Sequence, residues 1–218
     1  MERFHSLIDQ EATLPPEYED LIERQEKRPD QGTRFKDTIY SDKWPSILWQ
    51  ESAIKTREFF AERLTGKPLV DLGGGRGWMT GFANELRVGE YVNVDRNHNQ
   101  ALPSDPYRII NSSPLGTNIQ ADMLDFAARL KDGVANFTIN GVNQEAIDDE
   151  RYHAALAKEI LRATQSGGLI FGIKSRVITE ISKIMDSGNS PVREVNLKKE
   201  TGYCFRTPYI QSVFEKTK

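Results

Sequence analysis

The strongest indication of the fold in this sequence is the stretch KPLVDLGGGRGWMTGFANELR, residues 67 to 87. Its first part, residues 69–72, is a short apolar run that is typical of a buried strand. Its last part, residues 79–86, repeats apolar side chains at the spacing of one helix face. Between them, glycine occupies positions 73, 74, 75 and 77, which would weaken any regular element. The stretch therefore predicts a strand, a sharp glycine turn that a ligand can approach, and a helix whose first amides face that ligand.

The spacing of these glycines excludes the common dinucleotide fingerprint. The pattern G-x-G-x-x-G would need a glycine where this sequence has Trp78 or Thr80. The pattern present is D-x-G-x-G-x-G from Asp71, and it resembles the first motif of class I S-adenosylmethionine (SAM) dependent methyltransferases. A glycine turn without a ligand is the alternative interpretation. The resemblance implies a SAM site, with S-adenosylhomocysteine (SAH) as the product, that includes Asp71, Gly73, Gly74, Gly75 and Gly77.

A second strand, residues 91–94, ends at Asp95, which lies 24 residues after Asp71. An acidic residue at this distance from a glycine turn, at the tip of the second strand, can accept hydrogen bonds from both hydroxyls of a ribose. An ionised carboxylate suits this task because it only accepts. We therefore interpret Asp95 as a ribose ligand, with a solvated loop aspartate as the alternative. By resemblance Asp95 is the second methyltransferase motif, and its neighbour Arg96 is a further cofactor contact.

A third short strand, residues 118–121, is predicted after a stretch that we interpret as irregular, residues 97–117. The strand ends at Asp122, and Met123 follows. In the methyltransferases that the sequence resembles, an acidic residue here accepts a hydrogen bond from the adenine amino group, and the next residue touches the ring. The resemblance therefore implies that Asp122 and Met123 bind adenine. Asp122 is also a suitable N-cap for the helix predicted after it, and the two roles are compatible.

A fourth strand, residues 134–139, ends at Asn140. In the family that the sequence resembles, this strand tip faces the methyl group of the cofactor, so the resemblance implies that Asn140 contacts the cofactor. Methyltransferases that act on amino groups or bases often carry Asn/Asp-Pro-Pro-Tyr here, whereas this sequence continues with Gly141 and lacks Pro-Pro-Tyr. This departure argues against an enzyme that methylates DNA or an amide, and it leaves a small-molecule acceptor open.

The C-terminal part of the chain completes an α/β domain. A helix along residues 152–163 and a buried strand, residues 169–173, follow the fourth strand. A further helix, 177–185, and two closing strands, 192–197 and 209–214, resemble the hairpin-like ending of the methyltransferase family. We therefore predict a Rossmann-like, doubly wound α/β fold, with a seven-stranded, mostly parallel sheet, an antiparallel last strand and helices on both faces.

Residues 67–218 form the SAM-binding domain in this interpretation, and residues 1–66 form an N-terminal helical extension. Helices are predicted in this extension over residues 17–27 and 46–64. Its second half also contains a cluster of aromatic residues: Phe35, Tyr40, Trp44 and Trp49. A lid over the cofactor and plain packing are both open interpretations of that cluster.

Methyl transfer from a sulfonium requires the donor and the acceptor to be aligned and shielded from water, and it requires a base only where the acceptor loses a proton. The sequence assigns no catalytic residue, and two histidines, His98 and His153, are candidate bases. His153 adjoins an apolar stripe, which favours a structural histidine. After the fifth strand, Lys174, Ser175 and Arg176 could contact an anionic substrate or belong to a solvated loop.

The composition narrows the choice of partners and compartment. A formal net charge of −3 with scattered basic residues argues against a nucleic-acid surface. The single cysteine, Cys204, excludes an internal disulfide and a cysteine zinc site, and no ligand spacing indicates a metal. The sequence has neither a secretory signal pattern nor an apolar run of the ~20 residues that a membrane helix needs, so we expect a cytoplasmic protein without a membrane partner.

The function that these features predict is SAM-dependent methyl transfer by in-line displacement to a small molecule. A SAM-binding regulatory or partner protein without catalysis is one alternative, and a methyltransferase that acts on protein or RNA is another. A nucleotide-binding oxidoreductase is a third alternative, against which the failed dinucleotide pattern argues. The oligomeric state stays open at this point.

Overall fold

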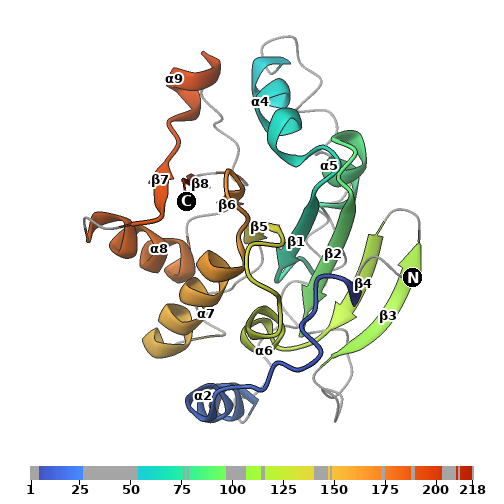
Figure 1. Ribbon diagram of the computed structural model, residues 1–218, viewed down its shortest axis with the longest axis vertical. Helices are drawn as coiled ribbons and strands as arrows, with labels where there is room; N and C mark the ends of the chain where they lie inside the picture. The colour runs from blue at the N-terminus through green and yellow to red at the C-terminus, as the bar shows by residue number, and fades with distance from the viewer. Residues whose placement is uncertain are drawn as a thin grey trace.

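The computed structural model describes residues 5–26, 54–75, 77, 79–96, 107–113, 116–139, 147, 149–172, 175–187, 190–202, 210 and 212–217. Within this part, one sheet of eight strands has the order β3-β4-β2-β1-β5-β6-β8-β7 (Figure 1). The strands are β1 (Pro68–Leu72), β2 (Glu90–Asp95), β3 (Arg108–Ser113), β4 (Gly116–Gln120), β5 (Asn136–Ile139), β6 (Leu169–Gly172), β7 (Val192–Glu194) and β8 (Ser212–Lys216).

The centre of the sheet is parallel, and its last strand is reversed. β1 pairs in parallel with β2 and β5, β2 pairs in parallel with β4, and β5 pairs in parallel with β6. β8 is antiparallel to both of its neighbours, β6 and β7. These pairings confirm the predicted doubly wound, mostly parallel sheet with an antiparallel last strand.

The sheet contains one strand more than the seven predicted. The additional strand, β3, lies within residues 97–117, where the prediction of irregular structure was therefore wrong. β3 is antiparallel to β4 and stands at the edge of the sheet, so it needs a partner on one side only. An edge strand does not require the continuous apolar run of a central strand, which is why this segment carried no clear strand signal.

The bounds of the two closing strands also differ from the prediction. β7 ends at Glu194, because a short helix, α9 (Leu197–Thr201), begins where the strand was predicted to end. The side chain of Asn196 caps this helix by accepting a hydrogen bond from the backbone N–H of Lys199 at 3.1 Å. An asparagine after a short strand was thus a helix start rather than a strand position.

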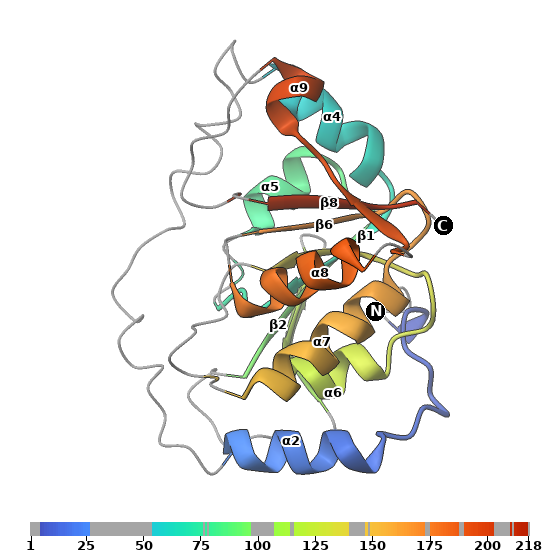
Figure 2. The same ribbon diagram turned by 90° about the vertical axis from the view of Figure 1, so that its left-hand side faces the viewer.

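Helices cover both faces of the sheet (Figure 2). They are α6 (Met123–Ala128), α7 (Glu150–Ala163) and α8 (Arg176–Asp186) on one face, and α4 (Ile54–Leu64) and α5 (Thr80–Glu85) on the other. Alternate residues of β1 divide between these layers, since Val70 and Leu72 belong to the larger apolar cluster with α7 and Leu69 to the smaller cluster with α5. No helix in the described part combines the length and the apolar character needed to cross a bilayer.

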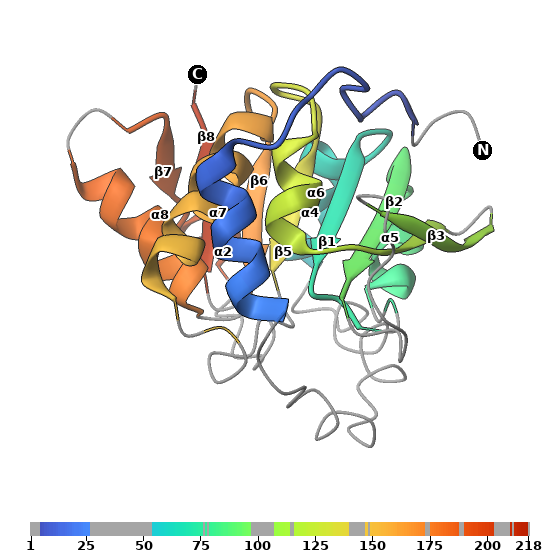
Figure 3. The same ribbon diagram turned by 90° about the horizontal axis from the view of Figure 1, so that it is seen from below.

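The N-terminal segment packs on the outside of α6 and α7 through α2 (Pro16–Glu26), which confirms the helix predicted there (Figure 3). Leu7, Ile8 and Tyr18 belong to the same apolar cluster as the sheet, and Ile8 forms an isolated antiparallel bridge with Leu130. The four aromatic residues on which the lid hypothesis rests lie outside the described residues. The division of the chain at residues 66 and 67 stays a prediction.

Candidate functional site

The glycine turn after β1 is tied to the neighbouring strand by its backbone. The Gly73 N–H donates to the carbonyl of Val94 at 2.8 Å, and the Gly77 N–H closes the turn on the carbonyl of Gly74 at 2.9 Å. Gly75 has a φ of 55°, in the left-handed region that residues with a side chain rarely adopt. The predicted strand, glycine turn and helix are therefore confirmed, with the turn held against the carboxyl end of β2.

A row of polar side chains crosses the sheet beneath this turn. The strand register places Asp71 of β1 between Thr138 of β5 and Asn93 of β2, and it places Asn93 beside Asn118 of β4. Thr138, Asp71 and Asn93 are completely buried. Asp71 lies two residues after Leu69, so it points toward the α5 face of the sheet, where the turn leads into α5. A buried polar row is costly unless it is hydrogen-bonded, so its partners matter.

The polar row hydrogen-bonds to the turn, and two of its buried oxygen atoms have no hydrogen-bond partner among the described residues. The Asn93 Nδ2 donates to the carbonyl of Gly75 and to the Asn118 Oδ1, both at 2.9 Å. The Tyr91 hydroxyl donates to the Asp71 Oδ2 at 2.8 Å. Within the described residues, the Asp71 Oδ1 and the Asn93 Oδ1 are buried without a hydrogen-bond partner. Two orphaned acceptors under a glycine turn are what a ligand with N–H groups would satisfy.

Gly74 is the point of closest approach between the turn and this row. A Cβ atom at position 74 would lie 2.3 Å from both the Asn93 Oδ1 and the Asp71 Oδ2. No side chain fits there without displacing two buried polar groups. The glycine is therefore required by close packing against these two side chains, while the approach of a ligand to the turn stays a prediction.

The Asp71 carboxyl is poised between its two protonation states. Burial raises the pKa of Asp71 to about 7, against the opposing effect of the hydrogen bond from Tyr91 and with a further increase from the nearby charge of Asp95. Both forms of Asp71 are therefore populated near neutral pH. Perturbed carboxyls of this kind are common at functional sites.

Asp95 stands at the end of β2, beside the turn, as predicted. Its Oδ2 accepts a hydrogen bond from the Gly75 N–H at 2.8 Å, so the carboxylate also fixes the turn. Burial raises the pKa values of Asp122 and Tyr152, and the positive charge of Arg96, which follows Asp95 and is half-buried, opposes this effect. The ends of β2 and β4 thus lie close enough to share an electrostatic environment, while the ribose role of Asp95 stays a prediction.

Asp122 caps α6, which confirms one of its two predicted roles. Its Oδ1 accepts from the Leu124 N–H and from the Tyr152 hydroxyl, both at 2.8 Å. Burial raises the pKa of Asp122, and the hydrogen bond from Tyr152 opposes this effect. Met123 is the first residue of α6 and is also buried. Binding of adenine by Asp122 and Met123 stays a prediction.

The candidate base that the structure describes, His153, lies in the interior of the molecule. Only 1% of its surface is exposed, and its Nε2 lies 2.9 Å from the backbone carbonyl oxygen of Ile147. Burial lowers the pKa of His153, so the ring is neutral at physiological pH. This environment suits a structural histidine. The other candidate base, His98, and the predicted cofactor contact Asn140 lie outside the described residues.

The remaining predictions for the site concern metal ions and contacts of residues 174–176 with a substrate. Within the described part of the chain, no group of three or more His, Cys, Asp or Glu side chains could hold a metal ion. Ser175 is buried and caps α8, because its Oγ accepts a hydrogen bond from the Ile178 N–H at 3.3 Å. Ser175 therefore stabilises the start of α8. Arg176, the first residue of α8, is half-buried, and Lys174 lies outside the described residues.

The sequence alone did not assign three polar residues of β2 and α7 that support the predicted site, namely Tyr91, Asn93 and Tyr152. Asn93 lies between Val92 and Val94 in an apolar run. A polar residue in a buried strand needs a hydrogen-bond partner, so its position indicated a polar contact. Tyr91 and Tyr152 gave no such sign, because a tyrosine in a strand or on an apolar helix face also fits plain packing. Only the structure pairs these hydroxyls with Asp71 and Asp122.

Comparison with known proteins identifies the fold. No protein-family model matches the sequence, and no curated protein matches it. The chain is similar to the crystal structure of a SAM dependent methyltransferase from Archaeoglobus fulgidus, with 14% identity and a TM-score of 0.50 over 75% of this chain and 93% of that one. It is also similar to an rRNA methylase from Streptococcus thermophilus, with 11% identity and a TM-score of 0.44 over 78% and 99% of the two chains. A precorrin-6y C5,15-methyltransferase from Geobacter metallireducens has 10% identity and a TM-score of 0.46 over 78% and 90%. The strand order and the match to the Archaeoglobus structure agree, and the chain has the class I, Rossmann-like fold of SAM-dependent methyltransferases.

Proposed function

We propose that the protein is a SAM-dependent methyltransferase that acts on a small molecule. One observation carries this proposal: the glycine turn lies directly on two buried acceptors and is joined to the Asp95 carboxylate through the Gly75 N–H at 2.8 Å. Asp71 lies next to the last residue of β1, Asp95 ends β2 and Asp122 follows β4. The three acidic side chains are thus at the same edge of a parallel sheet, where ligands of doubly wound folds bind.

The residues present fit the cofactor. Asp95 would accept from the ribose hydroxyls, Asp122 and Met123 would contact the adenine, and the turn with Asp71 would hold the amino acid part. The orphaned Oδ1 of Asp71 supports this assignment, because it gives a buried acceptor to an ammonium group. When bound, SAM supplies a methyl group on a positively charged sulfur. The chain then needs to hold the acceptor in line and to exclude water.

A small-molecule acceptor fits the charge of the chain better than a polyanion. The formal net charge is −3, whereas proteins that bind nucleic acid depend on clustered basic residues for most of their affinity. The absence of Pro-Pro-Tyr after Asn140 in the sequence removes the usual arrangement for a base or amide nitrogen. The acceptor class is tested by supplying separate metabolite, RNA and protein fractions and following SAH formation.

Isothermal titration with SAM and SAH tests the cofactor assignment. We expect micromolar binding by the wild type, with an affinity about 10- to 100-fold lower in Asp95→Ala, because a charged acceptor and an anchor of the turn are both lost. Asp95→Asn should lose less, since its amide oxygen can still accept from the Gly75 N–H. Asp20→Ala, on the exposed face of α2, is the matched control and should bind like the wild type. A folded wild type that binds neither ligand would refute the assignment.

SAM binding without catalysis is the second candidate function. It is favoured by one observation on the candidate base His153. This histidine is buried, and its Nε2 lies 2.9 Å from the backbone carbonyl oxygen of Ile147. The two functions differ in turnover. Formation of SAH from SAM with any of the three fractions supports the enzyme, whereas tight binding without SAH formation in all of them supports the regulatory protein.

A further inference from the structure

We propose that Tyr91 is a positioning residue of this site, whose hydroxyl holds the Asp71 carboxyl under the glycine turn and couples the proton of that carboxyl to cofactor binding. This inference rests on the proposed function, because it concerns the same cofactor site. It adds a residue that no sequence motif assigns. It also assigns a pH dependence to the affinity of the site.

The geometry of Tyr91 is that of a connector between β1 and α5. Its ring is 3% exposed and belongs to the apolar cluster under α5, so its position is fixed by packing. Its hydroxyl donates to the Asp71 Oδ2 at 2.8 Å. Burial raises the pKa of the Tyr91 hydroxyl, and Met79 and Thr80, at the start of α5, oppose this effect. The hydroxyl therefore lies between the Asp71 carboxyl and the start of α5.

The charges that surround Asp71 explain why its proton is sensitive to a ligand. Two described residues act on the Asp71 carboxyl, Tyr91 through the hydrogen bond from its hydroxyl and Asp95 through its negative charge; both lie on β2, and neither is a cation. β5 contributes Thr138 opposite Asp71, and the turn contributes Gly74, and neither of these titrates. Burial raises the pKa of Asp71 to about 7, while the Tyr91 hydroxyl lowers it. A cationic ligand group would favour the ionised form further.

The linkage between proton and ligand has a definite sign. SAH carries an ammonium group, which binds more tightly to the ionised carboxyl than to the neutral acid. Affinity should therefore rise with pH until Asp71 is fully ionised. With a pKa of about 7, the wild type should bind SAH about tenfold more tightly at about pH 8 than at about pH 6.

Titration of SAH as a function of pH tests the inference on Tyr91→Phe, which keeps the ring and removes the hydroxyl. Loss of the hydrogen bond that lowers the pKa of Asp71 should move the affinity profile to higher pH. A displacement of about one pH unit weakens binding about fivefold at about pH 7 and hardly changes it at about pH 9. The matched control is Tyr18→Phe, which removes a buried hydroxyl from Glu159, remote from the site, and should keep the wild-type profile.

Thermal unfolding of the free protein provides a readout that needs no ligand. Because the pKa of Asp71 is raised in the folded state, the stability that this group contributes falls as pH rises through that pKa. The fall should extend to higher pH in Tyr91→Phe than in the wild type. The fall in stability should be absent in Asp71→Asn and in the double variant that combines Tyr91→Phe with Asp71→Asn.

The outcomes separate the two proposals. If the wild type binds no SAH, the proposed function fails, and the unfolding profiles still decide whether Tyr91 sets the proton affinity of Asp71. If the wild type binds SAH and Tyr91→Phe weakens binding equally at every pH, the hydroxyl has only a structural role and the inference is overturned. Unchanged affinity and unfolding profiles in Tyr91→Phe overturn it as well.

Discussion

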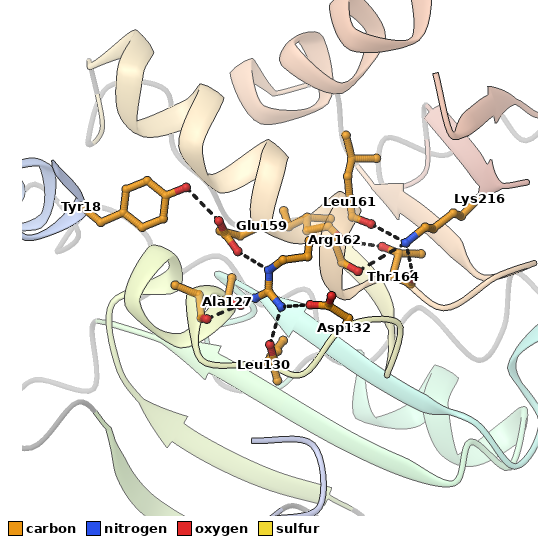
Figure 4. A network of polar contacts seen from close by, with 11 residues as sticks. Tyr18, Ala127, Leu130, Asp132, Glu159, Leu161, Arg162, Thr164 and Lys216 are labelled. Carbon is orange, nitrogen blue, oxygen red and sulfur yellow. Dashed lines mark hydrogen bonds and ion pairs between the residues drawn. The ribbon is translucent and has the colours of Figure 1, made fainter. Parts of the chain in front are cut away.

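Two polar clusters, one buried and one partly exposed, lie at opposite edges of the sheet and use their hydrogen-bonding capacity in different ways. The carboxyl-edge cluster consists of Asp71, Tyr91 and Asn93 and lies under the glycine turn. The amino-edge cluster lies where α6 and α7 end (Figure 4), and its side chains are Tyr18, Asp132, Glu159, Arg162 and Lys216. The first keeps buried acceptors without a partner in the described residues, whereas in the second the charged side chains converge on one another and on helix ends.

The amino-edge cluster supplies cations to two helix C-termini. Arg162 donates to the carbonyls of Ala127, Ala128 and Leu130 at the end of α6, and also to Glu159 at 2.6 Å. Lys216, at the end of β8, donates to carbonyls in the last turn of α7 and just after it. Carbonyls at a helix end have no partner within the helix, so a cation there satisfies both hydrogen bonding and the helix dipole.

The difference between the clusters separates stability from function. A satisfied network in a low-dielectric interior makes one structure specific and resists opening. A cluster with orphaned acceptors costs stability, and the fold tolerates it where a ligand can supply the missing donors. Variants of the amino-edge cluster should therefore lower the free energy of unfolding without changing the affinity for SAH. Variants of the carboxyl-edge cluster should mainly change that affinity.

The largest expected effect is on stability, from Arg162→Ala. Removing the guanidinium takes one of two donors from the Glu159 carboxylate and also takes the donor from three carbonyls at the end of α6, so the free energy of unfolding should fall by about 3 to 5 kcal/mol. Urea unfolding measures it. Arg24→Ala, which breaks an exposed ion pair with Asp20 on α2, should cost less than about 0.5 kcal/mol. Equal costs for the two arginine variants would contradict a special role of the amino-edge cluster.

The second effect is the pH dependence of stability that Asp71 confers. Its pKa in the folded protein, about 7, lies above the ordinary value of 3.8, so the folded state binds the proton more tightly. The stabilising contribution is full below the ordinary pKa and is lost as pH rises through about 7, which amounts to roughly 4 kcal/mol. Asp71→Asn removes this loss. The difference in unfolding free energy between the wild type and the variant should therefore decrease from about pH 4 to about pH 8, and parallel profiles would show that Asp71 does not titrate in this range.

The third effect is on affinity, from Gly74→Ala. Its methyl group would meet the Asn93 and Asp71 side-chain oxygens at 2.3 Å, so the turn must move. SAH affinity should fall by about 30- to 100-fold, or about 2 to 3 kcal/mol. Gly167→Ala, near Lys216 at the other edge, is the control. It has a φ of 69° and open space around it, so it should cost about 1 kcal/mol of stability and leave affinity unchanged. Wild-type affinity in Gly74→Ala would remove the turn from the ligand site.

The smallest expected effect comes from Tyr18→Phe in the amino-edge cluster. The hydroxyl donates to the Glu159 Oε1 at 2.8 Å, while Arg162 still holds the other oxygen of that carboxylate. Loss of one buried hydrogen bond should lower the free energy of unfolding by about 1 kcal/mol, measured by urea unfolding. A loss as large as that of Arg162→Ala would mean that α2, rather than the guanidinium, holds this cluster together.

Elements with local signals could be predicted from the sequence alone. The glycines after residue 72 specified a turn, because they give a backbone conformation that other residues resist, and the apolar runs specified central strands. Asp71, Asp95 and Asp122 could be placed at one edge of the sheet from their positions beside strand ends. Parallel connections bring those ends together in any doubly wound fold.

The contacts between side chains from distant parts of the chain could not be predicted in this way. Tyr91 and Asp71 lie 20 residues apart in the chain, and Lys216 lies 55 residues from Leu161. The same is true of β3, an edge strand that exists because β4 offers it a partner. Local sequence encodes backbone conformation and burial of a face, whereas register and long-range hydrogen bonds depend on free energies that arise only when distant segments pack together.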